Sequence, residues 1–175
     1  MNILIVVDMQ NDFVSGSLAT EEAKAIVPCV VDKINNFDGK IIYTRDTHFD
    51  DYLNTSEGKK LPIEHCIKDS FGWDIVNPVK ELVGESKIID KPSFGSIELP
   101  KLVYEVAGFN KISSITLIGL CTDICVLSNA LILKAAFPEV EILVDASCCA
   151  GTTVQSHNTA LDALGPCQIE VINRS

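Results

Sequence analysis

The chain has 175 residues, of which 47% are hydrophobic, and this suits a single domain with a full core. Its formal net charge is −10, and a chain this acidic repels the phosphates of nucleic acids and the surfaces of anionic membranes. We therefore expect neither as a partner. The opening MNILIVVDMQ has a short apolar run without a basic stretch before it, so it does not resemble a signal peptide, and the protein is expected in the cytoplasm.

Six short apolar runs mark the expected strands, at residues 3–7, 40–44, 87–90, 115–120, 140–144 and 168–172. The first run, ILIVV, is continuous, and continuous β-branched runs are typical of strands covered on both faces of a parallel sheet. Between the runs, apolar residues recur at helical spacing. The expected helix boundaries are marked by Pro28, Gly39, Gly84 and Gly108 and, as N-caps, by Thr122 or Asp123 and by Thr152 or Thr153.

Strands and helices alternate along the whole chain, without a linker, an internal repeat or a low-complexity segment. The pattern predicts an α/β fold: a single doubly wound domain over residues 1–175, with a mostly parallel sheet of five or six strands and helices on both faces. The longest stretch without periodicity runs from Arg45 to about Trp73 and holds two of the three histidines. Loops of this length are commonly functional, and we expect this one to be so.

Chemically active residues follow four of the predicted strands. Asp8 follows the first strand, Asp46 and His48 the second, Lys91 the third and Cys125 the fourth. In open α/β sheets, ligands bind beyond the carboxyl ends of the strands. These side chains are therefore expected to meet at one site.

Cys125 is the candidate nucleophile, because free N–H groups at a predicted helix start favour a thiolate and can hold an oxyanion. Asp8 is the candidate proton acceptor, and Lys91 would keep its carboxylate charged and stabilise developing negative charge. Cys121 is interpreted as a turn residue that contributes its backbone. The other cysteines are interpreted as thiols packed like small hydrophobic residues, namely Cys29, Cys66, Cys148, Cys149 and Cys167.

The long loop carries donors of the kinds that bind transition metals. Asp46 and His48 form a D-x-H pair, and Glu57 and His65 follow in the same loop. Two imidazoles and two carboxylates suit one divalent ion, Zn²⁺ first, with Mn²⁺ or Fe²⁺ as the alternatives. Without a cation, carboxylates this close would repel each other.

Four segments, in this order along the chain, resemble the isochorismatase-like cysteine hydrolases and, among them, the nicotinamidases. IVVDMQNDF is similar to the family's opening strand, TRDTH to its metal-side segment, KPSFGS to its lysine segment and GLCTDICV to its nucleophile segment. The resemblance implies a catalytic triad of Asp8, Lys91 and Cys125. It implies metal ligands at Asp46, His48 and His65, with Glu57 as the fourth.

The resemblance also implies a cis peptide between Leu120 and Cys121, and an oxyanion hole made by the backbone N–H groups of Cys121 and Cys125. Phe13 and Leu120 are the candidate substrate-binding residues. The implied reaction is the hydrolysis of a small amide, with nicotinamide the first candidate, to the acid and ammonia through a Cys125 thioester. Such a reaction belongs to NAD salvage.

Two alternatives stay open. A metal-independent relative would act on an N-carbamoyl or ureido compound or on isochorismate. A protein that is not an enzyme would use Cys121 and Cys125 as a thiol redox sensor. The sequence also leaves open whether the chain forms a homo-oligomer.

Overall fold

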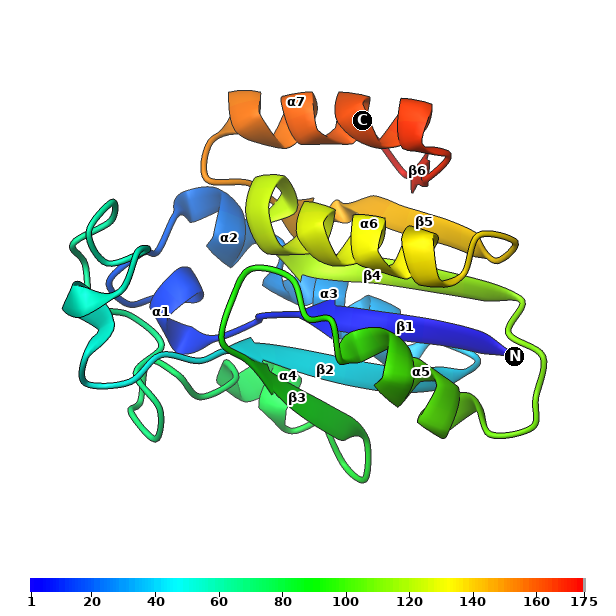
Figure 1. Cartoon of the computed structure of the whole chain (residues 1–175), viewed down its shortest axis with the longest axis horizontal. Helices are drawn as coiled ribbons and strands as arrows, with labels where there is room; N and C mark the ends of the chain where they lie inside the picture. The colour runs from blue at the N-terminus through cyan, green and yellow to red at the C-terminus, as the bar shows by residue number, and fades with distance from the viewer. Residues whose placement is uncertain (175) are drawn as a thin grey trace.

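A six-stranded sheet forms the centre of the computed structural model, which describes residues 1–174. The strand order is β3-β2-β1-β4-β5-β6, and neighbouring strands are parallel throughout (Figure 1). This confirms the predicted sheet. The strands are β1 (Asn2–Val7), β2 (Lys40–Asp46), β3 (Lys87–Lys91), β4 (Ser114–Leu120), β5 (Glu141–Ala150) and β6 (Glu170–Ile172).

The strand β1 is buried on both sides. Ile3, Ile5 and Val7 pack into one core cluster, whereas Leu4 and Val6 pack into the other. Successive side chains of a strand point to opposite faces, so a strand with helices on both sides needs a continuous apolar run. The ILIVV segment meets this need.

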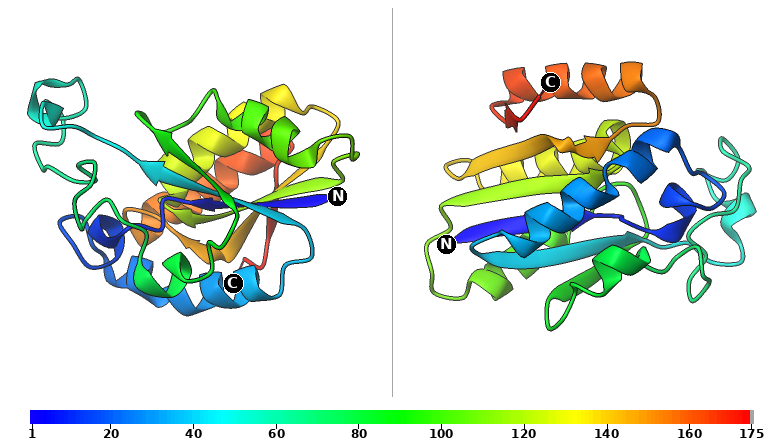
Figure 2. Two further views of the ribbon diagram at one scale, coloured as in Figure 1. Left: turned by 90° about the horizontal axis from the view of Figure 1, so that it is seen from below. Right: turned by 180° about the vertical axis from the view of Figure 1, so that it is seen from behind.

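Helices cover both faces of the sheet (Figure 2). The first core cluster joins one face to the helices α5, α6 and α7, and the second joins the opposite face to α1, α2, α3 and α4. The helices are α1 (Asn11–Val14), α2 (Glu21–Ala25), α3 (Val27–Asn35), α4 (Asn77–Lys80), α5 (Leu99–Ala107), α6 (Leu127–Ala136) and α7 (Val154–Leu164). No helix within residues 1–174 has the length and apolar character needed to cross a bilayer.

Some predicted helix boundaries differ from the structure. The helix expected before Gly84 is a single turn, α4, and α1 and α2 were not predicted. Neither Thr122 nor Asp123 is an N-cap, because the chain forms a π-helical turn over Thr122–Val126 before α6. Thr153 does cap α7, since its side chain accepts a hydrogen bond from the N–H of Ser156.

The carboxyl ends of the strands lie at one edge of the sheet. The strand order reverses between β1 and β4, which places the topological switch point of the sheet there. The segment between β2 and β3 includes a short 3₁₀ turn, Tyr52–Asn54, and projects beyond this edge (Figure 1). The candidate residues therefore gather at the edge where open α/β sheets bind ligands.

Candidate active site

Three buried side chains from three strand ends meet at this edge. Asp8 follows β1, Lys91 ends β3 and Cys125 lies in the π-helical turn after β4. The Nζ atom of Lys91 lies 2.7 Å from Oδ2 of Asp8 and 3.3 Å from Sγ of Cys125. Asp8 and Lys91 are fully buried, and Cys125 is 5% exposed. The structure thus brings together the acid, the cation and the thiol.

Hydrogen bonds hold Asp8 and Lys91 in fixed positions. The hydroxyl of Thr44 donates to Oδ1 of Asp8 at 2.6 Å, so the other carboxylate oxygen faces Lys91. Lys91 also donates to the carbonyl of Ser93 at 3.2 Å and to Oδ1 of Asp46 at 3.3 Å. One ammonium group therefore contacts two carboxylates and a sulfur.

Burial and charge set the protonation of this group. Burial raises the pKa of Asp8 even though the Lys91 charge opposes the shift. Burial also raises the pKa of the Cys125 thiol well above its usual range, and the negative charge of Asp8 adds to the effect. Burial disfavours the ammonium of Lys91, but the charges of Asp8, Cys125 and Asp46 outweigh this and raise its pKa well above the usual range. This shift favours a protonated thiol in the resting site, because burial outweighs the thiolate-favouring effect of the helix start.

The turn before the nucleophile has an unusual backbone. Gly119 has a φ of 111°, and a Cβ there would overlap the carbonyl oxygen of Val7, so this position requires glycine. The peptide between Leu120 and Cys121 is cis, as predicted. The side chain of Leu120 is fully buried in the core and does not line the cavity described below. Leu120 is thus placed to support the turn rather than to touch a ligand.

Two contacts that were not predicted hold the π-helical turn against the start of α7. The hydroxyl of Thr122 lies 2.8 Å from Nδ1 of His157. The carboxylate of Asp123 accepts hydrogen bonds from the backbone N–H and the hydroxyl of Thr152, at 2.9 Å and 2.6 Å. The side-chain oxygens of Thr122 and Asp123 could either cap a helix or bind a neighbouring segment. In the folded chain they bind His157 and Thr152.

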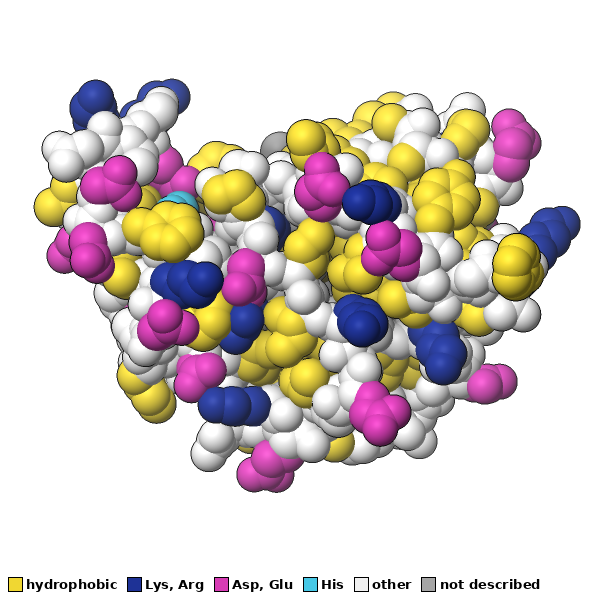
Figure 3. Space-filling view, turned by 60° about the horizontal axis from the view of Figure 1, so that its bottom comes forward, with side chains coloured by type: hydrophobic (Ala, Val, Ile, Leu, Met, Phe, Trp, Pro, Cys, Tyr) yellow, Lys and Arg dark blue, Asp and Glu magenta, His cyan; other side chains and the backbone are white. Residues whose placement is uncertain are grey.

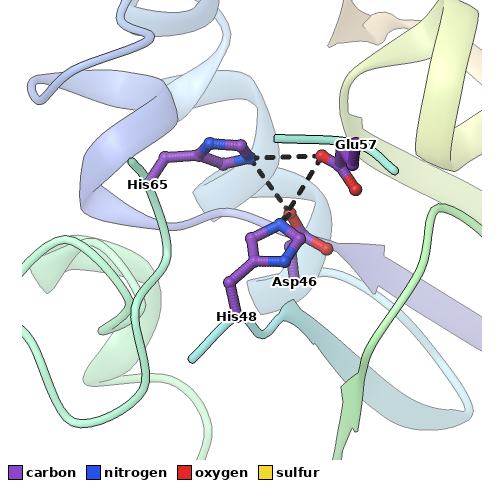
Figure 4. Close-up of side chains that lie close together, drawn as sticks. All are labelled: Asp46, His48, Glu57 and His65. Carbon is purple, nitrogen blue, oxygen red and sulfur yellow. Dashed lines mark hydrogen bonds and ion pairs between the residues drawn. The ribbon is translucent and has the colours of Figure 1, made fainter. Parts of the chain in front are cut away.

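A cluster of four side chains that could hold a metal ion lies beside Asp8, Lys91 and Cys125 (Figure 4). Asp46 ends β2, His48 follows it, and Glu57 and His65 come from the projecting loop. The Nε2 atom of His48 lies 3.1 Å from Oδ2 of Asp46 and 3.6 Å from Oε1 of Glu57. The Nε2 atom of His65 lies 3.6 Å from the same two oxygens.

These distances fit one small dication. With bonds of about 2.0 Å, the ligand atoms of a tetrahedral zinc site lie roughly 3.3 Å apart. Nδ1 of His65 lies 2.8 Å from the carbonyl oxygen of Ile63, an arrangement that leaves Nε2 free as a ligand. Oxygen and imidazole donors of this number and spacing suit zinc, manganese or iron.

Gln10 and Asp12, which follow β1, support the cluster, although the sequence did not predict this role. Gln10 accepts a hydrogen bond from the N–H of Asp46 at 2.7 Å and donates to its carbonyl at 2.9 Å. Asp12 accepts from the N–H of Cys66, next to His65, at 2.7 Å. Both belong to the VDMQNDF segment. The feature of the sequence that could have indicated their role is their position directly after the first core strand.

A cavity of about 680 Å³ opens onto both the thiol and the metal-binding cluster. Phe13 lines it, and its ring makes an edge-to-face contact with the ring of His65, with 5.8 Å between centroids. Trp73 does not line it, because that indole packs under the Arg45 guanidinium at 3.6 Å. Figure 3 shows this face hollowed beside a lobe at the upper left, with a histidine visible there. The lining also includes Leu18, Asp46, Glu57, Leu61, Phe94, Cys121, Ile124 and Cys125.

Comparison with known proteins identifies the family of the chain. The Isochorismatase domain model matches residues 2–175, so the chain belongs to the isochorismatase family. The nicotinamidase of Saccharomyces cerevisiae is 24% identical, with 83% of this chain and 87% of that protein covered.

Solved structures share the fold. The nicotinamidase/pyrazinamidase PncA of Bacillus subtilis has a TM-score of 0.80 at 24% identity, covering 97% of this chain and 98% of that one. The pyrazinamidase of Pyrococcus horikoshii in complex with zinc has a TM-score of 0.81 at 22% identity, with 99% of each chain covered. Family membership, together with nicotinamidase relatives, indicates a cysteine-dependent amidohydrolase.

Proposed function

We propose that this enzyme hydrolyses nicotinamide to nicotinic acid and ammonia through a thioester on Cys125. The observation that carries the proposal is the position of Lys91, whose ammonium lies within 3.3 Å of the thiol, of Asp8 and of the metal-binding residue Asp46. A thiol that lines a cavity, with a buried base and a buried cation beside it, provides the parts that amide hydrolysis through a covalent intermediate requires.

The first half of the reaction forms the thioester. Asp8, whose pKa burial raises, takes the proton of Cys125, and the sulfur attacks the amide carbonyl carbon. The backbone N–H groups of Cys121 and Cys125 hold the resulting oxyanion. The protonated Asp8 gives its proton to the leaving nitrogen, the C–N bond breaks and ammonia departs.

The second half releases the acid. Asp8 takes a proton from water, the hydroxide adds to the thioester carbonyl, and the C–S bond breaks. The sulfur then regains its proton from Asp8. Throughout, the Lys91 charge stabilises whichever neighbour is negative, the carboxylate of Asp8 or the thiolate of Cys125.

A divalent ion, zinc first, would be held by Asp46, His48, Glu57 and His65. When bound, such an ion supplies a fixed positive centre that binds a ring nitrogen or water and so orients the substrate. The chain itself supplies the rest of the positioning, because Phe13, Leu61 and Phe94 give the cavity apolar walls for an aromatic ring.

The nicotinamidase and pyrazinamidase relatives support an aromatic amide as the substrate. The metal-independent alternative, on an N-carbamoyl or ureido compound or on isochorismate, leaves four converging metal donors without a role. A sensor formed by Cys121 and Cys125 leaves the buried Asp8–Lys91 pair without a role. A cytoplasmic enzyme of NAD salvage is the setting that fits the proposed substrate.

An ammonia-release assay tests the proposal. The panel contains nicotinamide, pyrazinamide, benzamide, an aliphatic amide and an N-carbamoyl amine, each with zinc-loaded and chelated protein. We expect the highest kcat/KM with nicotinamide or pyrazinamide and its loss on chelation. Benzamide lacks the ring nitrogen and should react more slowly. Preferential turnover of the N-carbamoyl compound, unaffected by chelation, contradicts the proposal.

A further inference from the structure

Two cysteines far apart in the chain bring their sulfurs together away from the active site. Cys29 lies on α3 and Cys148 on β5, 119 positions later. The thiol of Cys148 donates to the sulfur of Cys29 at an Sγ–Sγ distance of 3.2 Å. No other pair of cysteine sulfurs is hydrogen-bonded within the part of the chain that the structure describes.

The two thiols differ in access. Cys148 is 2% exposed, whereas Cys29 is only partly buried and reaches the surface of α3. The Cys29 thiol points toward the hydroxyl of Ser147 at 3.7 Å, and that hydroxyl donates to Asp145 at 2.7 Å. A reagent in solution therefore meets Cys29 first and Cys148 only afterwards.

We propose that Cys29 and Cys148 form a dithiol modification site that a low-molecular-weight disulfide converts to an intramolecular disulfide. The Cys29 thiolate attacks one sulfur of the reagent, breaking its S–S bond and releasing one thiol. The Cys148 thiolate then attacks the Cys29 sulfur of the mixed disulfide and releases the second thiol. The protein loses two electrons and two protons, and one molecule of reagent is reduced to two thiols.

The geometry requires little movement. A disulfide has an S–S length near 2.05 Å, so the sulfurs must approach by about 1 Å from their present 3.2 Å. The neighbouring Cys149 does not compete, since it packs into the core cluster on the opposite face of β5. Cys125 does not compete either, because its sulfur contacts Lys91.

Peptide mapping of the native protein after treatment with oxidised glutathione tests the site. Cleavage after lysine and arginine separates residues 25–33, which hold Cys29, from residues 135–174, which hold Cys148, Cys149 and Cys167. We expect these two peptides to be disulfide-linked, and two hydrogens lighter than their sum. The Cys121 and Cys125 residues share a third peptide, 112–134, which we expect without an internal disulfide.

Single variants assign the partner. The link should persist in Cys149→Ser and Cys167→Ser and vanish in Cys148→Ser, which should instead hold one glutathione on Cys29. Treatment that leaves Cys29 unmodified in the wild type, or that stops at a glutathione adduct on Cys29 there, overturns the proposal. A link to Cys149 or Cys167 overturns it as well. The wild-type map shows whether Cys29 is linked to residues 135–174, and fragment-ion sequencing of that linked peptide locates the partner cysteine even if a variant does not fold.

Discussion

Lys91 connects the two chemical centres of the site. Its ammonium contacts Asp8 of the triad at 2.7 Å and Asp46 of the metal-binding cluster at 3.3 Å. Two carboxylates this deeply buried would be strongly destabilised without a cation, and the lysine also lies against the thiol. A single residue thus compensates the charges of both centres and couples their electrostatics.

Replacing Cys125 by Ala should abolish amide hydrolysis. The sulfur is the proposed nucleophile, and loss of a nucleophile costs at least about 10³-fold in kcat. Ammonia release measured at saturating substrate, with circular dichroism to verify folding, checks this.

The matched control is Cys121→Ala, four residues earlier in the same turn. Only the backbone of Cys121 is assigned a role, so this variant should keep kcat within about tenfold. Substantial ammonia release by folded Cys125→Ala protein would falsify the covalent mechanism.

At the scale of elements, the loop between β2 and β3 is the segment that completes the metal-binding cluster. Asp46 and His48 lie at the strand end, but Glu57 and His65 reach the cluster only because the loop folds back over it. The loop is held to the body by hydrogen bonds from the N–H of Cys66 to the carboxylate of Asp12 and from the amide of Gln10 to the carbonyl of Trp73. The metal affinity of the cluster should therefore fall when a single loop ligand such as Glu57 is changed.

Changing Glu57 to Gln should weaken zinc binding by at least about 10-fold, because a charged ligand becomes neutral. Competition with a chromogenic chelator measures the affinity. Glu64→Gln is the control, since Glu64 is an exposed carboxylate beside His65 in the same loop. Equal zinc affinity in the two variants would remove Glu57 from the ligand set.

Removing the metal should stop amide turnover without abolishing the reactivity of the Cys125 thiol. Chelated protein should lose amide turnover, yet Cys125 should still react with a small alkylating agent, because its base and cation remain in place. Mass spectrometry after iodoacetamide treatment measures this labelling. Full turnover by protein shown metal-free by elemental analysis contradicts the role given to the ion.

Asn129 links α6 to the loop that follows Lys91. Its amide accepts from the N–H of Ser96 at 2.9 Å and donates to the carbonyls of Phe94 and Cys125 at 3.2 Å and 2.8 Å. Asn129→Asp keeps the shape but loses both donors, so it should destabilise the fold by about 1–3 kcal/mol. Urea unfolding measures the change, and a midpoint equal to that of the wild type argues against this role.

At the scale of the molecule, Asp145 joins distant parts of the chain. It pairs with Lys33 on α3 at 2.7 Å and accepts hydrogen bonds from Ser147 and from Asn173 near the end of the described residues. Burial alone would raise the pKa of Asp145, but the hydrogen bonds from Lys33, Ser147 and Asn173 outweigh it and lower the pKa below the ordinary 3.8.

The free energy of unfolding should therefore depend on pH through the ionisation of Asp145. A carboxyl group whose pKa is lowered by folding stabilises the fold above its unfolded pKa and loses this effect as the pH falls through its folded pKa. Asp145→Asn should cost about 1–3 kcal/mol at pH 7, and the difference from the wild type should shrink below about pH 4. Urea unfolding of the variant and the wild type at pH 7 and at pH 3 measures this difference.

Asp162→Asn is the comparison, because Asp162 pairs with Arg174 at 2.6 Å but has a side chain 69% exposed. An exposed pair contributes little, so this variant should differ from the wild type by less than about 1 kcal/mol. A cost for Asp145→Asn that stays constant between pH 7 and pH 3 contradicts the linkage.

The sequence by itself determined the elements that depend on local pattern. All six strands overlap the apolar runs that predicted them, although β5 continues to Ala150, beyond the run at 140–144. The match is clearest for β1, because a strand buried on both faces needs a continuous apolar run. The residues after the strands could be assigned to one edge, since parallel strands share their carboxyl ends. The cis peptide before Cys121 followed from the resemblance of GLCTDICV to a known segment.

Only the tertiary structure decided which distant side chains meet. Thr122 was predicted as a cap, yet its hydroxyl contacts His157, and Cys29 was predicted as a packed thiol, yet it contacts Cys148. The helix expected before Gly84 is likewise only the single turn α4 in the structure. Periodicity indicates which face of an element is buried, but the partner of a polar atom depends on the packing of segments that are distant in the sequence, 35 positions apart for Thr122 and His157 and 119 for Cys29 and Cys148.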